Sequence, residues 1–328
     1  MATVIREMMR RKASFQLLSS GQHTVIVKRL TKVFDLPLPF FLSNENVASI
    51  QDAVKWFLKI APKIPKLLPT LHGNIVVVQG DTLSTLLGTL LAKIAHAKLA
   101  HVEAGMRSGD FFNPFPEELI RVVVDQLSDI LFAPSANCCE NLRREKVKGR
   151  IVSTKANTIV DAMRLVGNLD DPPSRPYAVV TLHRLETIMS PSKLKQALHI
   201  ICLISKRIHT VFVAHKSVQL RLKHGNIDCK ELLVYPDFIK LVSNAEFVAT
   251  DSGGLQEEAY YLGKPCLLLR DKTEHEEGLG ANVFVAGLDA EKAEFFLGNY
   301  QRFATKPVTL THSPSKLIAD TLVGMTRR

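Results

Sequence analysis

Short apolar runs alternate with longer amphipathic stretches along most of this chain. Asn74–Gln79 (NIVVVQ) is predicted to be a strand, Thr82–Lys98 a helix, and Leu99–Glu103 the next strand. A strand that follows a strand and a helix in this way usually returns parallel to the first, with the helix on one face of the sheet. The pattern therefore predicts an α/β fold built on doubly wound parallel sheets.

The same order of elements restarts after the Pro-rich segment DDPPSRP, which ends at Pro176. Gly263, followed by Lys264-Pro265, is a helix stop. We expect two Rossmann-like domains, residues 1–170 and 175–305, and a C-terminal helix in residues 306–328 that packs back on the first domain. In the second half we expect strands at Ala178–Leu182, Thr210–Ala214, Glu231–Tyr235, Phe247–Thr250 and Cys266–Leu269, and helices at Ser190–Arg207, Asp237–Asn244 and Leu255–Leu262.

The composition of the chain limits the kinds of molecule that it is expected to bind. Hydrophobic residues make up 46% of the 328 residues, and the net charge is +10. No apolar run approaches the roughly 20 residues of a membrane span, and the first residues lack the apolar core of a signal peptide. Lys and Arg are dispersed without interleaved aromatics, which argues against nucleic acid and fits an anionic small molecule equally well. The five cysteines and eleven histidines show no metal-ligand spacing. We expect a cytoplasmic protein without a metal, a membrane contact or a nucleic-acid partner.

Polar residues collect where the predicted strands end. Gly80–Thr82, Glu103–Gly105, His183-Arg184 and Asp251–Gly254 each follow an apolar run. Ligands of open parallel sheets bind outside the carboxyl ends of the strands. The sequence therefore places polar chemistry where the fold would bind a ligand, in both halves.

The segment TDSGGLQEEA, Thr250–Ala259, has two interpretations. It is a strand, a turn and a helix with acids in the first turn, or it is an anion site at a helix start. In the second case, N–H groups of Ser252, Gly253 and Gly254 hold a phosphate, and a glutamate further along holds hydroxyl groups.

Several longer motifs resemble one known family. They are SGQH at Ser20–His23, GDT at Gly80–Thr82, HVEAGMRSG at His101–Gly109, PEELIR at Pro116–Arg121, NTIVDAM at Asn157–Met163, TLHRLE at Thr181–Glu186 and TDSGGLQEEAYYLGKPCLLLRDKTE at Thr250–Glu274. In this order, and over nearly the whole chain, the motifs are similar to those of the non-hydrolysing UDP-N-acetylglucosamine 2-epimerases.

The resemblance implies a GT-B-type fold with the site in a cleft between the domains, catalytic carboxylates in the first domain and UDP binding in the second. It implies interconversion of UDP-N-acetylglucosamine and UDP-N-acetylmannosamine for surface polysaccharide, by loss of the C2 proton and departure of UDP, followed by re-addition. It also implies a UDP-sugar substrate, no cofactor, and a homodimer.

Asp81, Glu103 and Glu117 match the family's catalytic carboxylates, which would act as acid and base at C2. Each has an ordinary alternative. Asp81 is suited to cap the helix Thr82–Lys98. Glu103 is a strand-end acid that Arg107 could pair, and Glu117 is an acid in the first turn of a helix.

Three further residues match ligand-side positions of the family, and a fourth, Arg184, follows one of them. His183 matches the active-site histidine, which would stabilise the departing UDP, and Arg184 follows it. Arg121 matches a substrate-side arginine; its alternative is an ion pair with Glu117 one turn earlier. His215 matches a histidine near the ligand cleft.

The resemblance also selects the second interpretation of the segment TDSGGLQEEA. Ser252, Gly253 and Gly254 would present N–H groups to the phosphates. Glu258 matches the glutamate that accepts hydrogen bonds from the ribose. Glu257 points about 100° away around the helix and is expected to be an ordinary surface acid.

The chain departs from the family at several positions. The family's first strand and its GTRPE-type loop are absent, which would leave two neighbouring strands with unpaired edges. PEExNR reads PEELIR with Ile120, TGNT reads TKANT with Ala156, and TERPE reads TEHEE at Thr273–Glu277. Other open hypotheses are a 2-epimerase of a UDP-diacetamido sugar, a hydrolysing 2-epimerase, and a UDP-sugar-binding protein that has lost catalysis.

Overall fold

The computed structural model describes residues 1–22, 24–44, 50–110, 116–167, 169, 173–214, 216–219 and 226–326. The chain divides into two compact units, Met1–Ala162 with His312–Arg328, and Met163–Thr311. The division falls inside helix α8 (Ile159–Val166), eight residues before the end of the first expected domain. Each unit is built around its own parallel sheet.

The first unit has a four-stranded parallel sheet in the order β3-β4-β5-β6 and a separate parallel pair, β1-β2. The strands are β1 (Leu18–Ser19), β2 (Phe40–Phe41), β3 (Ile75–Gln79), β4 (Lys98–Val102), β5 (Ile130–Ala133) and β6 (Arg150–Ser153). Besides α8, the helices are α1 (Ala2–Arg10), α2 (Thr24–Val33), α3 (Ile50–Ile60), a 3₁₀ turn at Ala61–Lys63, α4 (Ile64–Leu71), α5 (Leu83–Ile94), α6 (Glu117–Leu127), α7 (Ala136–Arg144) and α15 (Pro314–Thr326).

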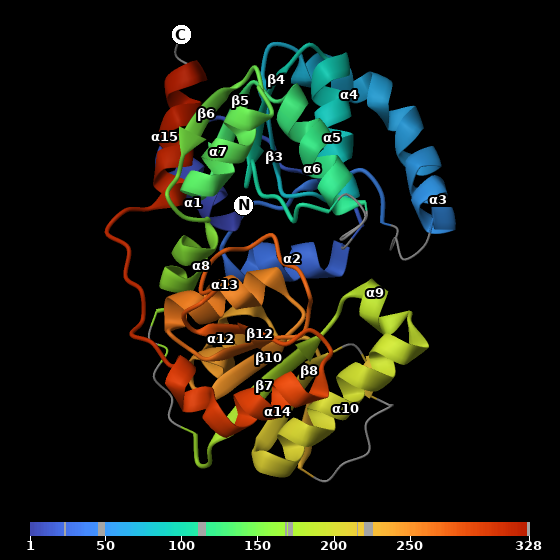
Figure 1. Ribbon diagram of the computed structural model, residues 1–328. Coiled ribbons are helices and arrows are strands. Elements are labelled where there is room, and N and C mark those ends of the chain that lie inside the picture. The colour runs from blue at the N-terminus through green and yellow to red at the C-terminus, as the bar shows by residue number, and fades with distance from the viewer. Residues whose placement is uncertain are drawn as a thin grey trace. The chain divides into compact units, whose positions relative to one another are not determined.

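Helix α15 returns to the first unit and lies beside α1 (Figure 1). Its Ile318 and Leu322 pack with Val4 of α1 and with Phe132 of β5 on one face of the sheet. Asp161 accepts hydrogen bonds from the hydroxyl of Ser313 at 2.9 Å and from the N–H of Ser315 at 2.8 Å, at the start of α15. These groups hold the C-terminal helix on the first sheet.

Strand β3 lies at an edge of its sheet. Within the described residues, β3 pairs only with β4, and β1 pairs only with β2. A pocket of about 290 Å³ is lined by Leu18, Ser20 and Leu42 on one side and by the consecutive residues 76–79 on the other. Because alternate residues of a strand point to opposite faces, four consecutive lining residues place the pocket along the edge of β3. The two strand edges expected to lack a partner are found here.

The second unit has a six-stranded parallel sheet in the order β12-β11-β10-β7-β8-β9. The strands are β7 (Tyr177–Leu182), β8 (His209–Ala214), β9 (Ile227–Lys230), β10 (Phe247–Thr250), β11 (Cys266–Leu268) and β12 (Val283–Val285). This is the Rossmann strand order, and the direction of winding reverses between β7 and β10. A ligand is therefore expected beyond the carboxyl ends of these two strands.

Helices cover both faces of the second sheet (Figure 1). They are α9 (Leu185–Ile188), α10 (Pro191–Arg207), α11 (Lys216–Gln219), α12 (Tyr235–Ser243), α13 (Gly253–Leu262), α14 (Ala290–Asn299) and a 3₁₀ turn at Tyr300–Phe303. Alternate residues of β7 point to opposite faces of the sheet. Val180 packs with Ile200 of α10 on one face, and Val179 packs with Val242 of α12 on the other. The fold class predicted from the sequence, α/β with two Rossmann-like parallel sheets, is confirmed.

Two predicted elements were wrong in extent. The predicted strand Glu231–Tyr235 lies at Ile227–Lys230 instead, and Tyr235 begins α12 with a proline in its first turn. Pro236 fixes the backbone angle that a helix start needs and cannot donate to a sheet. The predicted helix Thr82–Lys98 ends at Ile94, because His96 adopts a left-handed conformation with φ of 51°.

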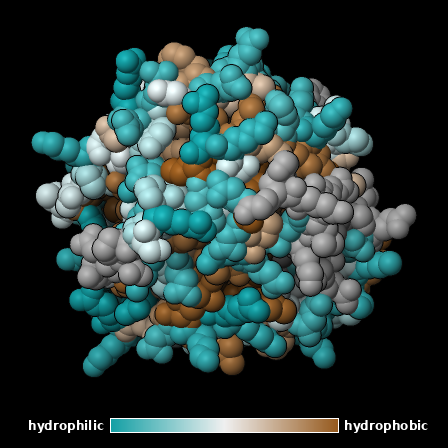
Figure 2. Space-filling view, turned by 90° about the horizontal axis from the view of Figure 1, so that it is seen from below, coloured by the Kyte–Doolittle hydropathy of each residue, from teal (hydrophilic) through white to brown (hydrophobic). Residues whose placement is uncertain are grey.

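Figure 2 shows hydrophobic side chains at the surface among hydrophilic ones on the face seen from below. Among the described residues, no helix is both long and apolar enough to cross a membrane.

Gly263 ends α13 in the left-handed conformation, with φ of 66°, and a Cβ there would lie 2.2 Å from the carbonyl oxygen of Thr305. We expect Gly263→Ala to lower the free energy of unfolding by at least ~1 kcal/mol, measured by urea denaturation. The matched control is Gly298→Ala in α14, where a Cβ meets nothing within 4 Å. That change should be neutral or stabilise by up to ~1 kcal/mol. Equal effects of the two changes would contradict the steric argument.

Candidate functional site

The first group of candidate residues lies at the carboxyl ends of β3 and β4. These strands are neighbours, with Gln79 opposite Val102, so Asp81 and Glu103 follow adjacent strand ends. Helix α5 is capped by Thr82, whose hydroxyl accepts from the N–H of Thr85 at 3.3 Å. The interpretation of Asp81 as the helix cap is therefore wrong, and its carboxylate has another partner.

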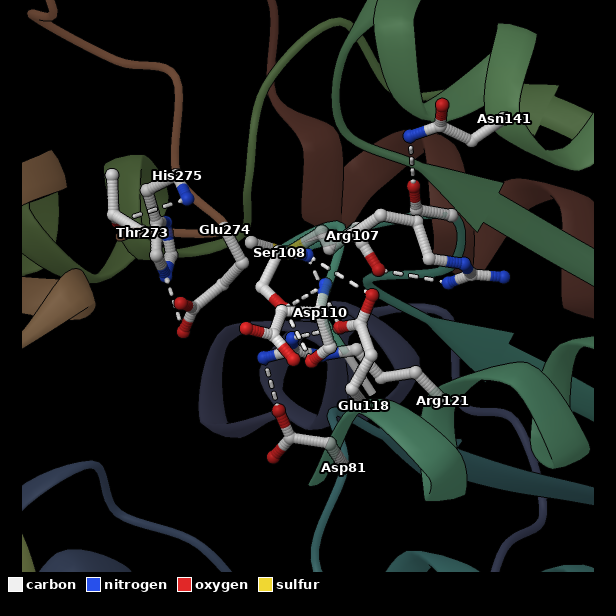
Figure 3. Close-up of polar contacts among 12 residues, drawn as sticks. Asp81, Arg107, Ser108, Asp110, Glu118, Arg121, Asn141, Thr273, Glu274 and His275 are labelled. Carbon is white, nitrogen blue, oxygen red and sulfur yellow. Dashed lines mark hydrogen bonds and ion pairs between the residues drawn. The ribbon is translucent and has the colours of Figure 1, made fainter. Parts of the chain in front are cut away.

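Asp81 forms an ion pair with Arg121 of α6. Arg121 is buried and also donates to Glu118 at 3.1 Å, and Figure 3 shows both carboxylates directed at its guanidinium. Glu118 in turn accepts from the N–H of Ser108 at 3.1 Å. The buried Arg121 thus pairs with Asp81 from the loop after β3, and Glu118 of the same helix fixes the position of Arg121.

Glu103 has a strained backbone, with φ of 71°, a region that non-glycine residues rarely adopt. Its carboxylate accepts from the side-chain amide of Gln79 at 2.7 Å and lies over Gly80, where a Cβ would approach it to 3.3 Å. The alternative pairing with Arg107 is wrong, because Arg107 pairs with Asp125 and Glu145. Strain of this kind is often retained where a side chain must be aimed at a site.

A buried network holds the loop that follows β4. Asp125 of α6 is fully buried and accepts from His101 of β4 at 2.6 Å, from the N–H of Gly105 at 3.0 Å and from Arg107 at 2.8 Å. Burial alone would raise the pKa of Asp125, but the hydrogen bond from His101 and the charges of His101 and Arg107 outweigh it and hold the pKa below its usual value. Asn141 adds a hydrogen bond to the carbonyl of Gly105 at 3.0 Å (Figure 3).

Glu117 is the first residue of α6, as its interpretation as a first-turn helix acid requires, and its catalytic role stays a prediction. Two of the departures from the family pattern have packing roles. Ile120 packs in the core with Val78 and Leu99, and Ala156 is buried.

The second group lies at the switch point of the second sheet, after β7 and β10. Asp251 is fully buried and accepts from the N–H of His183 at 3.1 Å and from the N–H of Arg184 at 2.9 Å. It also contacts the Nδ1 atom of His183 at 3.1 Å. Burial would raise the pKa of Asp251, but the hydrogen bond and charge of His183 and the two backbone donors lower it. Asp251 therefore fixes the loop after β7 and orients the half-exposed imidazole of His183.

Helix α13 begins at Gly253, directly after β10. Ser252 is its cap: the hydroxyl accepts from the N–H of Leu255 at 3.3 Å, while the N–H of Ser252 donates to Thr250 at 2.9 Å. The N–H of Ser252, which we expected to bind a phosphate, donates to Thr250 instead. The donor that Ser252 can supply to a ligand is therefore its hydroxyl proton. In the described part of the chain, no acceptor is found for the N–H groups of Gly253 and Gly254.

Glu258 is buried one turn further along α13 and interacts with Tyr235 of α12. Burial raises the pKa of Glu258, the interaction with Tyr235 opposes this and the charge of Glu257 adds to it, and the net result is a pKa of about 8. The site thus contains a buried carboxyl group with a raised pKa.

The expectation of Glu257 as a surface acid is wrong, because it is 1% exposed. Its carboxylate lies 3.4 Å from Nδ1 of His275, which follows β11 in the chain. Periodicity gave the correct direction, away from Glu258, but the loop after β11 covers that face of α13. Glu257, His275 and Glu277 offer ligand atoms within 4.8 Å of one another, a spacing that a metal ion could use.

His215, and His23 of the SGQH motif, lie outside the described residues. The expected place of His215 near the ligand stays a prediction. The sequence reasoning missed Glu118, Asp251 and His275 as site residues. Glu118 could have been found from the pair of glutamates before Arg121, and Asp251 from its place at the strand end. No signal in the sequence indicated that His275 would meet α13.

A family model described as UDP-N-acetylglucosamine 2-epimerase matches residues 6–306. The chain is 34% identical to a UDP-N-acetylglucosamine 2-epimerase of Methanocaldococcus jannaschii, over 87% of this chain and 84% of the relative. It is 32% identical to a protein of the same name from Campylobacter jejuni, over 86% of this chain and 81% of that relative.

Solved structures agree. The Methanocaldococcus jannaschii UDP-GlcNAc 2-epimerase in complex with UDP-GlcNAc and UDP superposes with a TM-score of 0.87 at 29% identity, over 98% of this chain and 95% of that one. The Neisseria meningitidis UDP-GlcNAc 2-epimerase bound to UDP-GlcNAc gives 0.84 at 26% identity, over 99% and 96%. The predicted GT-B-type fold class is confirmed.

Removal of the Asp125 carboxylate should destabilise the first unit. We expect Asp125→Ala to cost about 3–5 kcal/mol at neutral pH, because the buried His101 and the largely buried Arg107 would each lose a partner. Since the folded pKa of Asp125 is depressed, its contribution is present above pH ~4, the unfolded value, and is lost as pH falls through the folded pKa. The stability gap to wild type should therefore narrow in acid.

The measurement is urea denaturation as a function of pH, with Glu140→Ala as the control. Glu140 pairs with Arg144 at 3.3 Å on the exposed face of α7, and its loss should cost less than ~0.5 kcal/mol at any pH. A gap between Asp125→Ala and wild type that widens in acid would contradict the assigned network.

Proposed function

The chain belongs to the UDP-N-acetylglucosamine 2-epimerase family, and we propose that it interconverts UDP-N-acetylglucosamine and UDP-N-acetylmannosamine, as a precursor step of surface polysaccharide. The observation that carries the proposal is the pair of carboxylates Asp81 and Glu103 at adjacent strand ends, one held by Arg121 and the other on a strained backbone. Inversion at C2 needs a group that removes the proton from one face and a group that returns it to the other.

In the proposed reaction, a carboxylate among Asp81, Glu103 and Glu117 removes the C2 proton while the C1–O bond to UDP breaks. The electron pair of the C2–H bond becomes the C1–C2 double bond of a 2-acetamidoglucal, and UDP leaves with the electrons of the C1–O bond. A second carboxyl group then returns a proton to the opposite face of C2, and UDP re-adds at C1. Arg121 keeps Asp81 in place through the cycle.

The second unit is proposed to bind UDP. The N–H groups of Gly253 and Gly254, with the hydroxyl of Ser252, receive the diphosphate at the start of α13. His183 and Arg184 come from the neighbouring strand end, and His183 donates from Nε2 to the departing oxygen while Asp251 holds Nδ1. Glu258 accepts from the ribose hydroxyls.

The proposed chemistry uses only side chains and needs no cofactor. We also propose that the protein is a homodimer, as the family resemblance implies. Light scattering measures the mass of the protein in solution and tests this.

Incubation with UDP-N-acetylglucosamine in deuterated water tests the function. Deuterium at C2 together with UDP-N-acetylmannosamine supports it. Free N-acetylmannosamine would indicate the hydrolysing reaction, and UDP binding without exchange would indicate a protein that only binds. Turnover of a UDP-diacetamido sugar alone would indicate the related substrate.

We expect Asp81→Asn to abolish C2 exchange, by at least ~100-fold, while UDP affinity stays nearly unchanged, because the amide keeps the shape but cannot accept the proton. Exchange is measured by NMR and affinity by calorimetry. Asp228→Asn, on the exposed part of β9, is the control that should change neither. Loss of UDP affinity with normal exchange would exclude the assigned role.

Glu258→Gln tests the contact with the ribose. Because the pKa of Glu258 is about 8, the group is mostly uncharged at pH ~7, so the contact is an ordinary hydrogen bond of about 0.5–1.5 kcal/mol and UDP should bind about 2- to 10-fold more weakly. The binding of 2′,3′-dideoxy-UDP should be weak in the wild type and should not fall further in the variant. An equal loss for both ligands would mean that Glu258 supports the fold rather than the ribose.

A further inference from the structure

The backbone that leads into Asp81 is held on both sides of Gly80. Gly80 lies between β3 and Asp81 and has a left-handed backbone, with φ of 71°. Its N–H donates to the carbonyl of Val102 in β4 at 3.1 Å. Its carbonyl oxygen lies 2.9 Å from Nε2 of His101, also in β4. Because this carbonyl belongs to the peptide bond between Gly80 and Asp81, its hydrogen-bonding partner fixes the direction in which the chain enters Asp81.

His101 is fully buried, and each of its ring nitrogens has an oxygen atom within hydrogen-bonding distance. Nδ1 lies 2.6 Å from Oδ1 of Asp125, and Nε2 faces the carbonyl of Gly80. A carbonyl oxygen can only accept a hydrogen bond, and the same holds for an ionised carboxylate. A ring nitrogen without a hydrogen would direct its lone pair at such an oxygen. Both nitrogens therefore carry a hydrogen, which makes the ring an imidazolium.

The surroundings of Asp125 favour its ionised form. Its second carboxylate oxygen accepts from the N–H of Gly105 at 3.0 Å and from Arg107 at 2.8 Å. Burial would raise the pKa of Asp125, but the hydrogen bond from His101 and the charges of His101 and Arg107 hold this pKa below its usual value. Arg107 also pairs with Glu145 at 2.5 Å. With Asp125 ionised, the charges of these four side chains cancel only when His101 is an imidazolium.

The ring of His101 thus joins the loops that follow two neighbouring strands. Through Nε2 it contacts the carbonyl before Asp81, and through Nδ1 it contacts Asp125, which holds the loop that begins at Glu103. The side chain of His101 is 0% exposed, so it does not reach a ligand itself. Any effect of His101 on the reaction therefore acts through the positions of its neighbours.

We propose that His101 is a positioning residue for the epimerisation: its Nε2–H holds the carbonyl of Gly80 and thereby keeps the carboxylate of Asp81 where it exchanges a proton with C2. This inference rests on the proposed function, which assigns the proton transfers at C2 to carboxylates of the first unit. The bond from Nδ1 to Asp125 stabilises the fold, whereas the bond from Nε2 serves turnover. The rate therefore depends on the hydrogen at Nε2.

Two amide variants separate the two bonds. In His101→Gln the amide nitrogen takes the place of Nε2, and in His101→Asn it takes the place of Nδ1. We expect His101→Asn to lower kcat for C2 exchange by about 10- to 100-fold, because small displacements of a reacting group have effects of this size. KM for UDP-N-acetylglucosamine should change by less than about 3-fold. His101→Gln should keep a kcat at least ~10-fold above that of His101→Asn. It should nevertheless be the less stable variant in urea, because Asp125 loses the donor at Nδ1.

Exchange is measured by NMR in deuterated water, and rates are divided by the folded fraction from circular dichroism. His72→Gln is the matched control. Nδ1 of His72 lies 2.9 Å from the carbonyl of Ala95, near the opposite end of β3, and its loss should leave kcat unchanged. Equal kcat of the two His101 variants, or a higher kcat of His101→Asn, would overturn the inference and leave His101 only as the partner of Asp125.

A measurement on the wild type does not depend on whether the variants fold. The ¹⁵N chemical shifts of the His101 ring, assigned through its bonded carbon atoms, should show a hydrogen on both nitrogens at pH ~7. A ring with one bare nitrogen would also overturn the inference. If the wild type shows no C2 exchange, the proposed function fails and the inference fails with it. Exchange by the wild type, with equal kcat of both variants, rejects the inference alone.

Discussion

Parallel strand pairing is the constraint on which both candidate groups depend. Because hydrogen-bonded parallel strands end at one edge, residues distant in the sequence meet there without any direct attraction between them. In the first unit this brings together the residues that follow β3 and β4, and in the second unit those that follow β7 and β10. Strand register, rather than side-chain chemistry, therefore sets the positions of the residues that follow these strands: Asp81, Glu103, His183 and Ser252.

Buried charges then fix the loops that the strands bring together. Asp125 and Asp251 are each fully buried; Asp125 accepts from one backbone N–H and Asp251 from two, and each also contacts a histidine. A buried carboxylate without partners would be very costly, so each one requires its loop to adopt the conformation that supplies the donors. One residue stabilises the loop next to Glu103 and the other orients His183.

The two adjacent glutamates of α13 illustrate how neighbours in sequence acquire separate roles. Glu258 faces Tyr235 of α12, whereas Glu257 faces His275 beyond β11. Both are buried, and the charge of Glu257 contributes to the raised pKa of Glu258. The helix thus presents a protonatable acid on one side and a paired acid on the other, a turn from its own start.

The sequence by itself determined the parallel α/β fold, the family and most candidate residues, because periodicity, strand-end polar residues and long motifs are local signals. It also gave the left-handed end of α13 at Gly263, which glycine followed by Lys-Pro encodes directly. Only the tertiary structure decided which partners the charges have: Thr82 rather than Asp81 caps α5, Glu103 meets Gln79 rather than Arg107, and Glu257 is buried under the loop that carries His275. Ion pairs and burial depend on which elements pack together, and that information is not contained in the spacing of residues along one element.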